Sequence, residues 1–191
     1  MEPLRLMVII GSTREGRFGP TVANWFVGEA RQHPDLDIDV LDLAEVGLPD
    51  RLTGYGAPPP VEVAAVTPRL AAADAYVVVT PEYNHSYPAP LKTLIDWHLD
   101  EWQAKPVAFV SYGGMSGGLR AVEHLRGVFA EVHATTVRET VSFHGGWARF
   151  DGALPIEAAE CATAAKTMLD QLAWWGHALR DARAARPYVT T

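Results

Sequence analysis

Cysteine is almost absent from this sequence, since Cys161 is the only one among 191 residues. A chain with one cysteine cannot close a disulfide on itself, which fits a reducing compartment, and we therefore expect a cytoplasmic protein. Cys161 lies in an alanine-rich stretch that favours helix. At such a position a cysteine is expected as a small core residue and not as a nucleophile.

Long apolar runs, an excess of basic residues and metal-ligand spacings are missing as well. No run of about 18 apolar residues occurs, and no basic segment precedes an apolar one near the N-terminus, so neither a membrane span nor a signal peptide is expected. The chain has 16 basic and 23 acidic residues, and this net charge of −7 excludes a non-specific binder of nucleic acid or of anionic membranes. The seven histidines follow no HExxH pattern, so no metal site is predicted.

The remaining composition is that of a globular chain, with 48% hydrophobic and 20% charged residues, and we expect one domain over residues 1–191. Apolar runs alternate with amphipathic segments. Strands are predicted at 4–10, 38–43, 75–80, 107–112 and 135–141, and helices at 20–32, 61–73, 88–101, 119–130 and 156–183. This alternation predicts a three-layer α/β/α sandwich around a five-stranded parallel sheet. Segments 44–60 and 142–154 are expected to be surface loops, either covering a pocket or without a function.

Five strands suit the flavodoxin-like order 2-1-3-4-5, in which the loops after strands one, three and four converge on one crevice. The most informative of these loops follows the apolar run 75–79 and reads PEYNHSYP over residues 81–88. It combines amide donors and acceptors with a stiff aromatic frame, as the edge of a flat heterocycle would require. The alternative is an ordinary proline-rich connection. Its candidate site residues are Pro81, Glu82, Tyr83, Asn84, His85 and Ser86.

The loop after the first strand, residues 11–20, has the features of a phosphate site. Free N–H groups at the start of a helix favour an anion, and nearby hydroxyl and guanidinium groups can add hydrogen bonds. A Walker P-loop is excluded because Arg17 and Phe18 replace its Lys and Ser/Thr, and the GxGxxG pattern is absent. A monophosphate fits best; the alternative is a turn with solvated arginines. Its candidate residues are Ser12, Arg14, Arg17, Phe18 and Gly19.

The loop after the fourth strand reads GGMSGG over residues 113–118. Glycine allows positive φ and a close approach of the backbone to a ligand, so Gly113 and Gly114 are candidates for contact with a ring edge. The N–H groups of such a loop could stabilise negative charge on a bound ring. A glycine-rich turn without any ligand is the alternative.

Taken together, these three segments resemble the NADPH-dependent FMN reductase family. The likeness is carried by PEYN-x-S-x-P-x-x-LK-x-x-IDW at 81–97, by Gly11–Arg14 and by residues 111–121, and it extends over about two-thirds of the chain. The resemblance implies bound FMN, with the three loops as its binding site and NADPH or NADH as electron donor. This chain departs from the family at Arg17 and Gly19, where common members have Ser and Asn, and at Pro20.

In such an enzyme the flavin carries out the redox chemistry, so no catalytic acid, base or nucleophile is expected from the protein. The resemblance implies a ping-pong reaction with a quinone, free flavin, azo or nitro compound, or metal oxyanion as second substrate. It also implies a homodimer or tetramer with helix 88–102 near the interface, where Trp97 and Trp102 are either contacts with the partner or aromatic residues of the core. Two alternatives remain open: a flavodoxin-type electron carrier, and a relative of this fold that has lost its flavin.

Overall fold

The computed structural model describes residues 2–54 and 56–189. Its central sheet has five parallel strands in the order β2-β1-β3-β4-β5. The strands are β1 (Leu4–Ile10), β2 (Leu36–Asp42), β3 (Ala75–Pro81), β4 (Pro106–Gly113) and β5 (Thr135–His144). This order confirms the flavodoxin-like three-layer α/β/α prediction.

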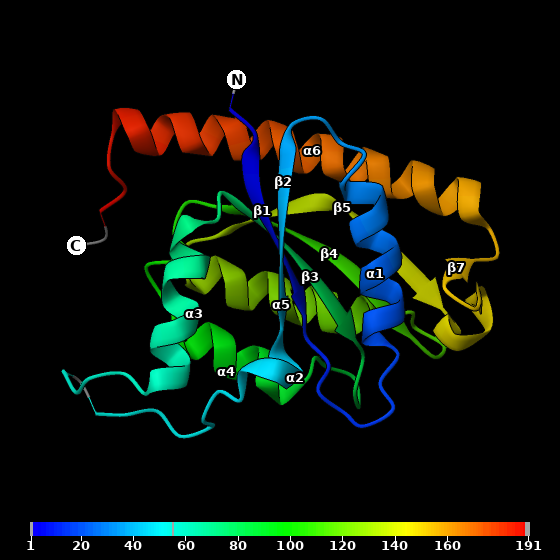
Figure 1. The fold of residues 1–191 in the computed structure, drawn as a ribbon, viewed down its shortest axis with the longest axis horizontal. Helices are drawn as coiled ribbons and strands as arrows, with labels where there is room; N and C mark the ends of the chain where they lie inside the picture. The colour runs from blue at the N-terminus through cyan, green and yellow to red at the C-terminus, as the bar shows by residue number, and fades with distance from the viewer. Residues whose placement is uncertain (1, 55, 190–191) are drawn as a thin grey trace.

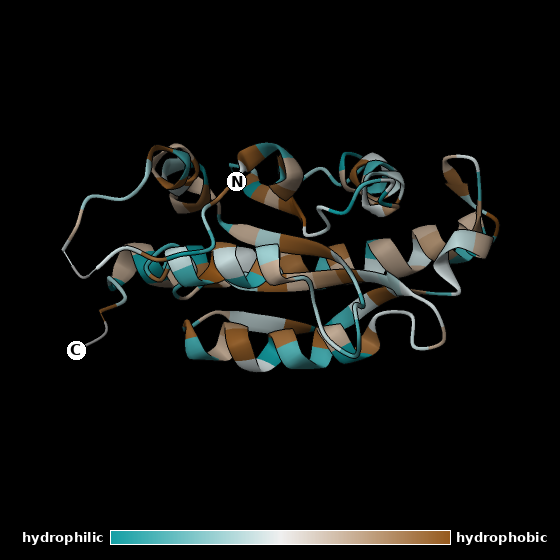
Figure 2. Ribbon diagram, turned by 90° about the horizontal axis from the view of Figure 1, so that it is seen from below, coloured by the Kyte–Doolittle hydropathy of each residue, from teal (hydrophilic) through white to brown (hydrophobic). Residues whose placement is uncertain are grey.

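Helices cover both faces of this sheet (Figures 1 and 2). They are α1 (Gly19–Ala30), α2 (Leu43–Val46), α3 (Val61–Ala72), α4 (Ala89–Trp97), α5 (Leu119–Glu131) and α6 (Ala158–Ala185). Helices α1 and α6 share a core with Leu6 and Val8, whereas α3, α4 and α5 share one with Met7 and Ile9. Successive residues of a strand point to opposite faces, so β1 supplies both cores. Strands β3 and β4 are buried along their whole length, as their apolar runs predict.

Helix α4 is shorter than predicted, because it ends at Trp97 instead of continuing to residue 101. The backbone of His98 turns to an extended conformation, and its buried ring contacts the Leu94 carbonyl oxygen at 2.9 Å and the Thr67 hydroxyl at 3.1 Å. Trp102 is fully buried, with its ring centroid 4.7 Å from that of Tyr76. The interpretation of Trp102 as a contact with a partner subunit is therefore wrong, because the side chain belongs to the core.

The two segments predicted as surface loops also contain regular structure. Strand β5 continues to His144 and is followed by a 3-10 helix, η1 (Gly146–Arg149), and by the short hairpin of β6 (Phe150–Asp151) and β7 (Leu154–Pro155). Segment 44–60 includes most of helix α2, and its Pro49 carbonyl accepts a hydrogen bond from Trp97 Nε1 at 2.8 Å. Both segments are thus fastened to neighbouring elements.

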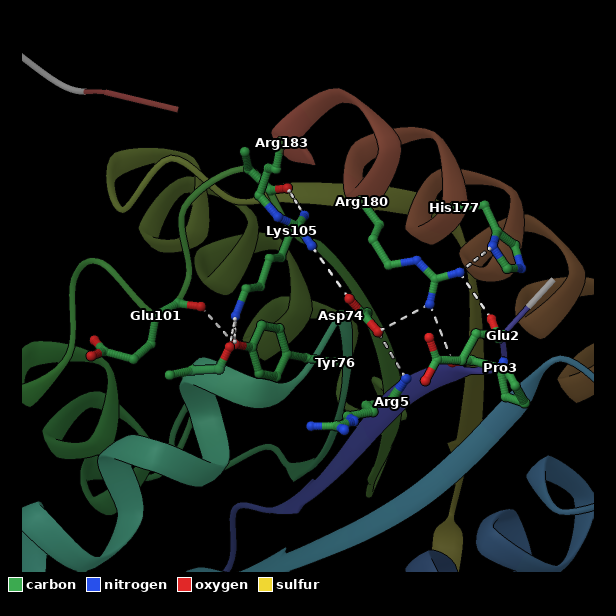
Figure 3. A network of polar contacts seen from close by, with 12 residues as sticks. Glu2, Pro3, Arg5, Asp74, Tyr76, Glu101, Lys105, His177, Arg180 and Arg183 are labelled. Carbon is green, nitrogen blue, oxygen red and sulfur yellow. Dashed lines mark hydrogen bonds and ion pairs between the residues drawn. The ribbon is translucent and has the colours of Figure 1, made fainter. Parts of the chain in front are cut away.

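A polar network fastens α6 to the edge of the sheet at which the strands begin (Figure 3). Asp74 accepts a hydrogen bond from the backbone N–H of Arg5 at 3.0 Å and lies 3.5 Å from both Arg180 and Arg183 of α6. The buried Lys105 ammonium donates to the Leu70 and Ala71 carbonyl oxygens and to the Tyr76 hydroxyl. In the part of the chain that the structure describes, no helix is both long and apolar enough to span a membrane.

Candidate functional site

Three loops meet at the opposite edge, where the parallel strands end. The first loop (residues 11–18) follows β1, the second loop (residues 82–88) follows β3, and the third loop (residues 114–118) follows β4. Backbone hydrogen bonds join each of the first two loops to the neighbouring strand. The Gly11 N–H donates to the Val79 carbonyl of β3 at 2.9 Å, and the Glu82 N–H donates to the Tyr112 carbonyl of β4 at 3.1 Å. The predicted convergence of the three motifs is therefore present in the structure.

The first loop contains donors that the protein itself leaves unpaired. The Ser12 hydroxyl is fully buried and has no hydrogen-bond partner among the described residues. Helix α1 begins here without a side-chain cap at Phe18, and within residues 2–54 and 56–189 the N–H groups of Ser12, Thr13, Phe18 and Gly19 bind no acceptor. Buried polar groups are normally satisfied, and the start of a helix favours negative charge. These residues therefore fit a phosphate group.

Glycine at position 19 is required by this arrangement. A Cβ on Gly19 would clash with the Ser12 hydroxyl and lie 3.0 Å from the hydroxyl of Tyr112. Burial raises the pKa of Tyr112 to about 12, and the neighbouring Ser12 hydroxyl offsets only part of this rise. Tyr112 thus stays a neutral donor beside Ser12, although the two hydroxyls do not meet in hydrogen-bond geometry. Tyr112 was not among the candidate residues, although it ends a buried strand and lies in the segment 111–121 that carries the family likeness.

The two arginines of the first loop differ in their surroundings. Arg17 forms two hydrogen bonds with the carboxylate of Asp42, both 2.6 Å long, and a third with the Ser12 carbonyl at 2.8 Å. The hydrogen bond to Asp42 raises the pKa of Arg17 above its usual value. Arg14 is exposed and makes no ion pair within the described part of the chain. Arg14 is therefore free to meet a phosphate, while the phosphate contact of Arg17 stays a prediction.

The second loop is a tight turn closed by two backbone hydrogen bonds between Tyr83 and Ser86, at 2.8 and 3.1 Å. Its central residues, Asn84 and His85, have φ of 49° and 77°. Positive φ at both central positions is the signature of a type I′ turn, and Asn and His tolerate this conformation better than most residues. Both side chains are exposed at the edge of the sheet. Their contact with a ring edge stays a prediction.

Glu82 links the second loop to the third. Its carboxylate accepts hydrogen bonds from the Ser116 hydroxyl at 2.5 Å, from the Arg120 N–H at 3.2 Å and from the Arg120 guanidinium at 2.9 Å. Burial would raise the pKa of Glu82, but these hydrogen bonds outweigh it and hold the pKa below its usual value. Glu82 is therefore ionised and links the two loops, and it does not serve as a proton donor.

The glycines of the third loop differ in how strongly the fold itself requires them. Gly117 and Gly118 have positive φ, at 62° and 88°, and a Cβ on either would meet neighbouring side chains within 2.7 Å. A Cβ on Gly113 would lie 3.1 Å from the Gly118 nitrogen, whereas one on Gly114 would meet nothing within 4 Å. The fold therefore requires glycine at 117 and 118. At Gly114 the fold leaves open space, and contact with a ring there stays a prediction.

A model of the NADPH-dependent FMN reductase family matches residues 4–148, which is most of the chain. An NAD(P)H-dependent FMN reductase of Schizosaccharomyces pombe is 37% identical over 122 residues, which are 60% of each chain. A 2-hydroxy-1,4-benzoquinone reductase of a Burkholderia species is 29% identical over 187 residues, covering 94% of this chain and 98% of the relative.

Among solved structures, the flavoenzyme FerB, an NAD(P)H:(acceptor) oxidoreductase of Paracoccus denitrificans, superposes with a TM-score of 0.75 at 22% identity. The superposition covers 92% of this chain and 98% of FerB. At this identity the likeness establishes the fold. The named relatives are reductases, so they give no support to the alternative of an electron carrier without NAD(P)H activity. With most of its length matched by the family model, the chain belongs to the NADPH-dependent FMN reductase family and is an enzyme that uses FMN with NAD(P)H as electron donor.

Proposed function

We propose that this enzyme transfers electrons to flat, uncharged ring compounds, foremost quinones, in a ping-pong reaction. The observation that carries this choice is a cavity of about 330 Å³ beside the first loop, between α2 and the start of α4. Leu43, Leu48 and Pro90 give the cavity an apolar lining, and Thr13 and Asp50 add polar atoms. A cavity of this size can hold one small aromatic molecule. The carboxylate of Asp50 disfavours metal oxyanions and other anions.

The chain's own residues would bind and orient both cofactor and substrate. The first loop would hold the phosphate of FMN through the Ser12 hydroxyl, the N–H groups at the start of α1 and the Arg14 guanidinium. The second and third loops would hold the edge of the ring through backbone groups. Bound FMN would supply the redox chemistry, accepting electrons from NAD(P)H and passing them on. The name of the Burkholderia relative, a benzoquinone reductase, supports the acceptor class.

The proposal is tested by separating the two half-reactions under anaerobic conditions. NADPH should bleach the FMN absorbance of the purified protein, and a benzoquinone should restore it faster than chromate does. Steady-state rates at varied NADPH and quinone should give parallel double-reciprocal lines. Intersecting lines would contradict the ping-pong scheme, and faster reoxidation by chromate would contradict the acceptor class. Asp50→Asn should speed reoxidation by chromate and leave that by benzoquinone unchanged, because it removes only the repulsion of anions.

We also propose a homodimer and a cytoplasmic location. The segment after α4 supports the dimer, because Leu99 is half exposed there and lies within the region 88–102 that the family resemblance places near the interface. Light scattering coupled to size exclusion should give twice the chain mass of 20.8 kDa. A monomer at micromolar concentration would contradict the dimer, and four times this mass would indicate a tetramer. The single free Cys161 supports the location, which a compartment-specific reporter fusion would test.

A further inference from the structure

The carbonyl oxygens of the third loop are held by donors from behind the loop. The Ser111 and Ser142 hydroxyls both donate to the carbonyl oxygen of Gly117, at 2.8 and 2.9 Å. The Nδ1 atom of His144 lies 3.0 Å from the carbonyl oxygen of Met115, and because a carbonyl only accepts, Nδ1 carries the proton. The Gly145 N–H donates to the carbonyl oxygen of Gly114 at 2.8 Å. Three of these four donors, Ser142, His144 and Gly145, lie at or just after the end of β5, in the segment 142–154 that was predicted to be a surface loop.

This arrangement fixes the direction of the N–H groups in the third loop. The peptide bond is planar and trans, so the C=O of one residue and the N–H of the next point in opposite directions. Since the carbonyls of Gly114, Met115 and Gly117 point to the end of β5, the N–H groups of Met115, Ser116 and Gly118 point away from it. These three N–H groups bind no acceptor within the described residues.

The close approach explains the glycine at position 117. A Cβ there would lie 2.5 Å from the Ser142 hydroxyl oxygen and 2.7 Å from the His144 ring, at a φ of 62° that side chains rarely adopt. Only glycine lets the backbone pass close enough for Ser142 and His144 to reach its carbonyl groups. The hydrogen bonds from Ser142 and His144 to the third loop therefore depend on glycine at position 117.

We propose that Ser142 and His144 are positioning residues for FMN, which they do not touch. By holding the carbonyls of the third loop, they present its N–H groups to the electron-rich edge of the cofactor. Preorganised N–H dipoles stabilise the reduced, more negative form more than the oxidised form, and therefore raise the reduction potential. This inference rests on FMN use by this enzyme and adds the residues that set its potential.

The test measures the FMN reduction potential by equilibration with a reference dye, in the wild type and in Ser142→Ala, His144→Phe and the double variant. Thr140→Ala is the matched control, because it removes a hydroxyl from the same strand without a bond to the loop. In the double variant, the ratio of the affinity for reduced FMN to the affinity for oxidised FMN should fall about tenfold. This change lowers a two-electron potential by about 30 mV. His144→Gln keeps an N–H donor, so its FMN reduction potential should lie much closer to that of the wild type than the potential of His144→Phe does.

Amide hydrogen exchange of Gly117 and Gly145, whose N–H groups both donate to the Gly114 carbonyl oxygen, is measured without added FMN and provides the readout that is independent of activity. Exchange there should be faster in the double variant and unchanged in Thr140→Ala. A double variant with wild-type potential, or with wild-type exchange at these two residues, would overturn the inference. Failure of the wild-type protein to bind FMN is a different result, because it would overturn the cofactor assignment itself.

Discussion

Arg17 and Asp42 form a bidentate ion pair that ties the first loop to the end of β2. Both terminal nitrogens of Arg17 lie 2.6 Å from separate oxygens of Asp42, and the side chains are only 17% and 13% exposed. The pair connects residues 25 positions apart in sequence. The first loop is therefore held in place from the side of the sheet that lies away from the second and third loops.

Replacing Arg17 by Met should loosen the first loop as a whole. The change leaves the Asp42 carboxylate largely buried without its partner, so the free energy of unfolding should fall by about 1–3 kcal/mol. Riboflavin and FMN should lose affinity to a similar extent, because the loop and not one contact is affected. Urea unfolding and calorimetry measure the two effects. In the double variant with Asp42→Asn, part of the stability should return. A loss confined to FMN would show that Arg17 leaves Asp42 to bind the phosphate.

Replacing Arg14 by Ala should weaken the binding of FMN without unfolding the protein. A hydrogen bond to a charged group contributes about 1.5–3 kcal/mol, so FMN affinity should fall roughly 10- to 150-fold. Riboflavin, which lacks the phosphate, should be affected much less. Calorimetric titration of both ligands measures this difference, with Arg31→Ala, an exposed arginine at the end of α1, as the control. Equal losses for both ligands would assign Arg14 to loop folding.

Replacing Gly19 by Ala should lower both stability and FMN affinity, although alanine favours helix. The new Cβ clashes with the buried Ser12 hydroxyl and lies 3.0 Å from the Tyr112 hydroxyl, so it fills space that the phosphate site needs. Gly28→Ala in the same helix is the control, because a Cβ there meets nothing within 4 Å. The free energy of unfolding of the Gly28→Ala variant should rise by about 0.5–1 kcal/mol. Thermal unfolding with and without FMN distinguishes the two. If the Gly19→Ala variant were as stable as the Gly28→Ala variant, the predicted clash between the new Cβ and the Ser12 hydroxyl would be wrong.

Lys105 should make stability rise with pH above about 8. Burial lowers the pKa of Lys105 from 10.5 to about 8, so between these values the unfolded chain binds a proton that the folded chain has lost. Excess protons on the unfolded state mean that the free energy of unfolding increases with pH. Burial has the opposite effect on the neighbouring Tyr76: its raised pKa removes stability as pH rises past 10.

The window for the Lys105 test therefore lies between pH 8 and 10. Urea unfolding at pH 7.5 and 9.5 should show a smaller pH-dependent gain in Lys105→Met than in the wild type. The comparison cancels groups that titrate equally in both proteins. An identical change with pH in the two proteins would show that Lys105 keeps its ordinary pKa in the fold.

The sequence was sufficient to predict the strand order and the edge of the sheet that carries the site. Buried strands such as β3 and β4 contain short apolar runs, and the loops that follow them contain turn residues and glycines. Local signals of this kind need no knowledge of distant partners. The positive φ of Asn84 and His85 agrees with the same argument, because both residue types tolerate it.

Partners that lie far apart in the sequence could not be predicted. The spacing of residues along the sequence does not predict that Arg17 binds Asp42. It also does not predict that Trp102 packs on Tyr76 inside the core. The extension of β5 to His144 was missed for a similar reason. Its last residues include the polar Ser142 and His144, which nevertheless continue the strand by pairing with Ser111 and Gly113 of β4, while their side chains bind the third loop. Tertiary contacts here override what local pattern predicts.

The anchored third loop changes the thermodynamics expected for cofactor binding. Ordering a flexible backbone costs about 1–2 kcal/mol of conformational entropy per residue. Since protein groups hold the carbonyls of Gly114, Met115 and Gly117 from behind, this cost falls on folding and not on association. The third loop should therefore have the same conformation with and without FMN. FMN should bind in a single kinetic phase, and its binding should cause no conformational change in the rest of the molecule.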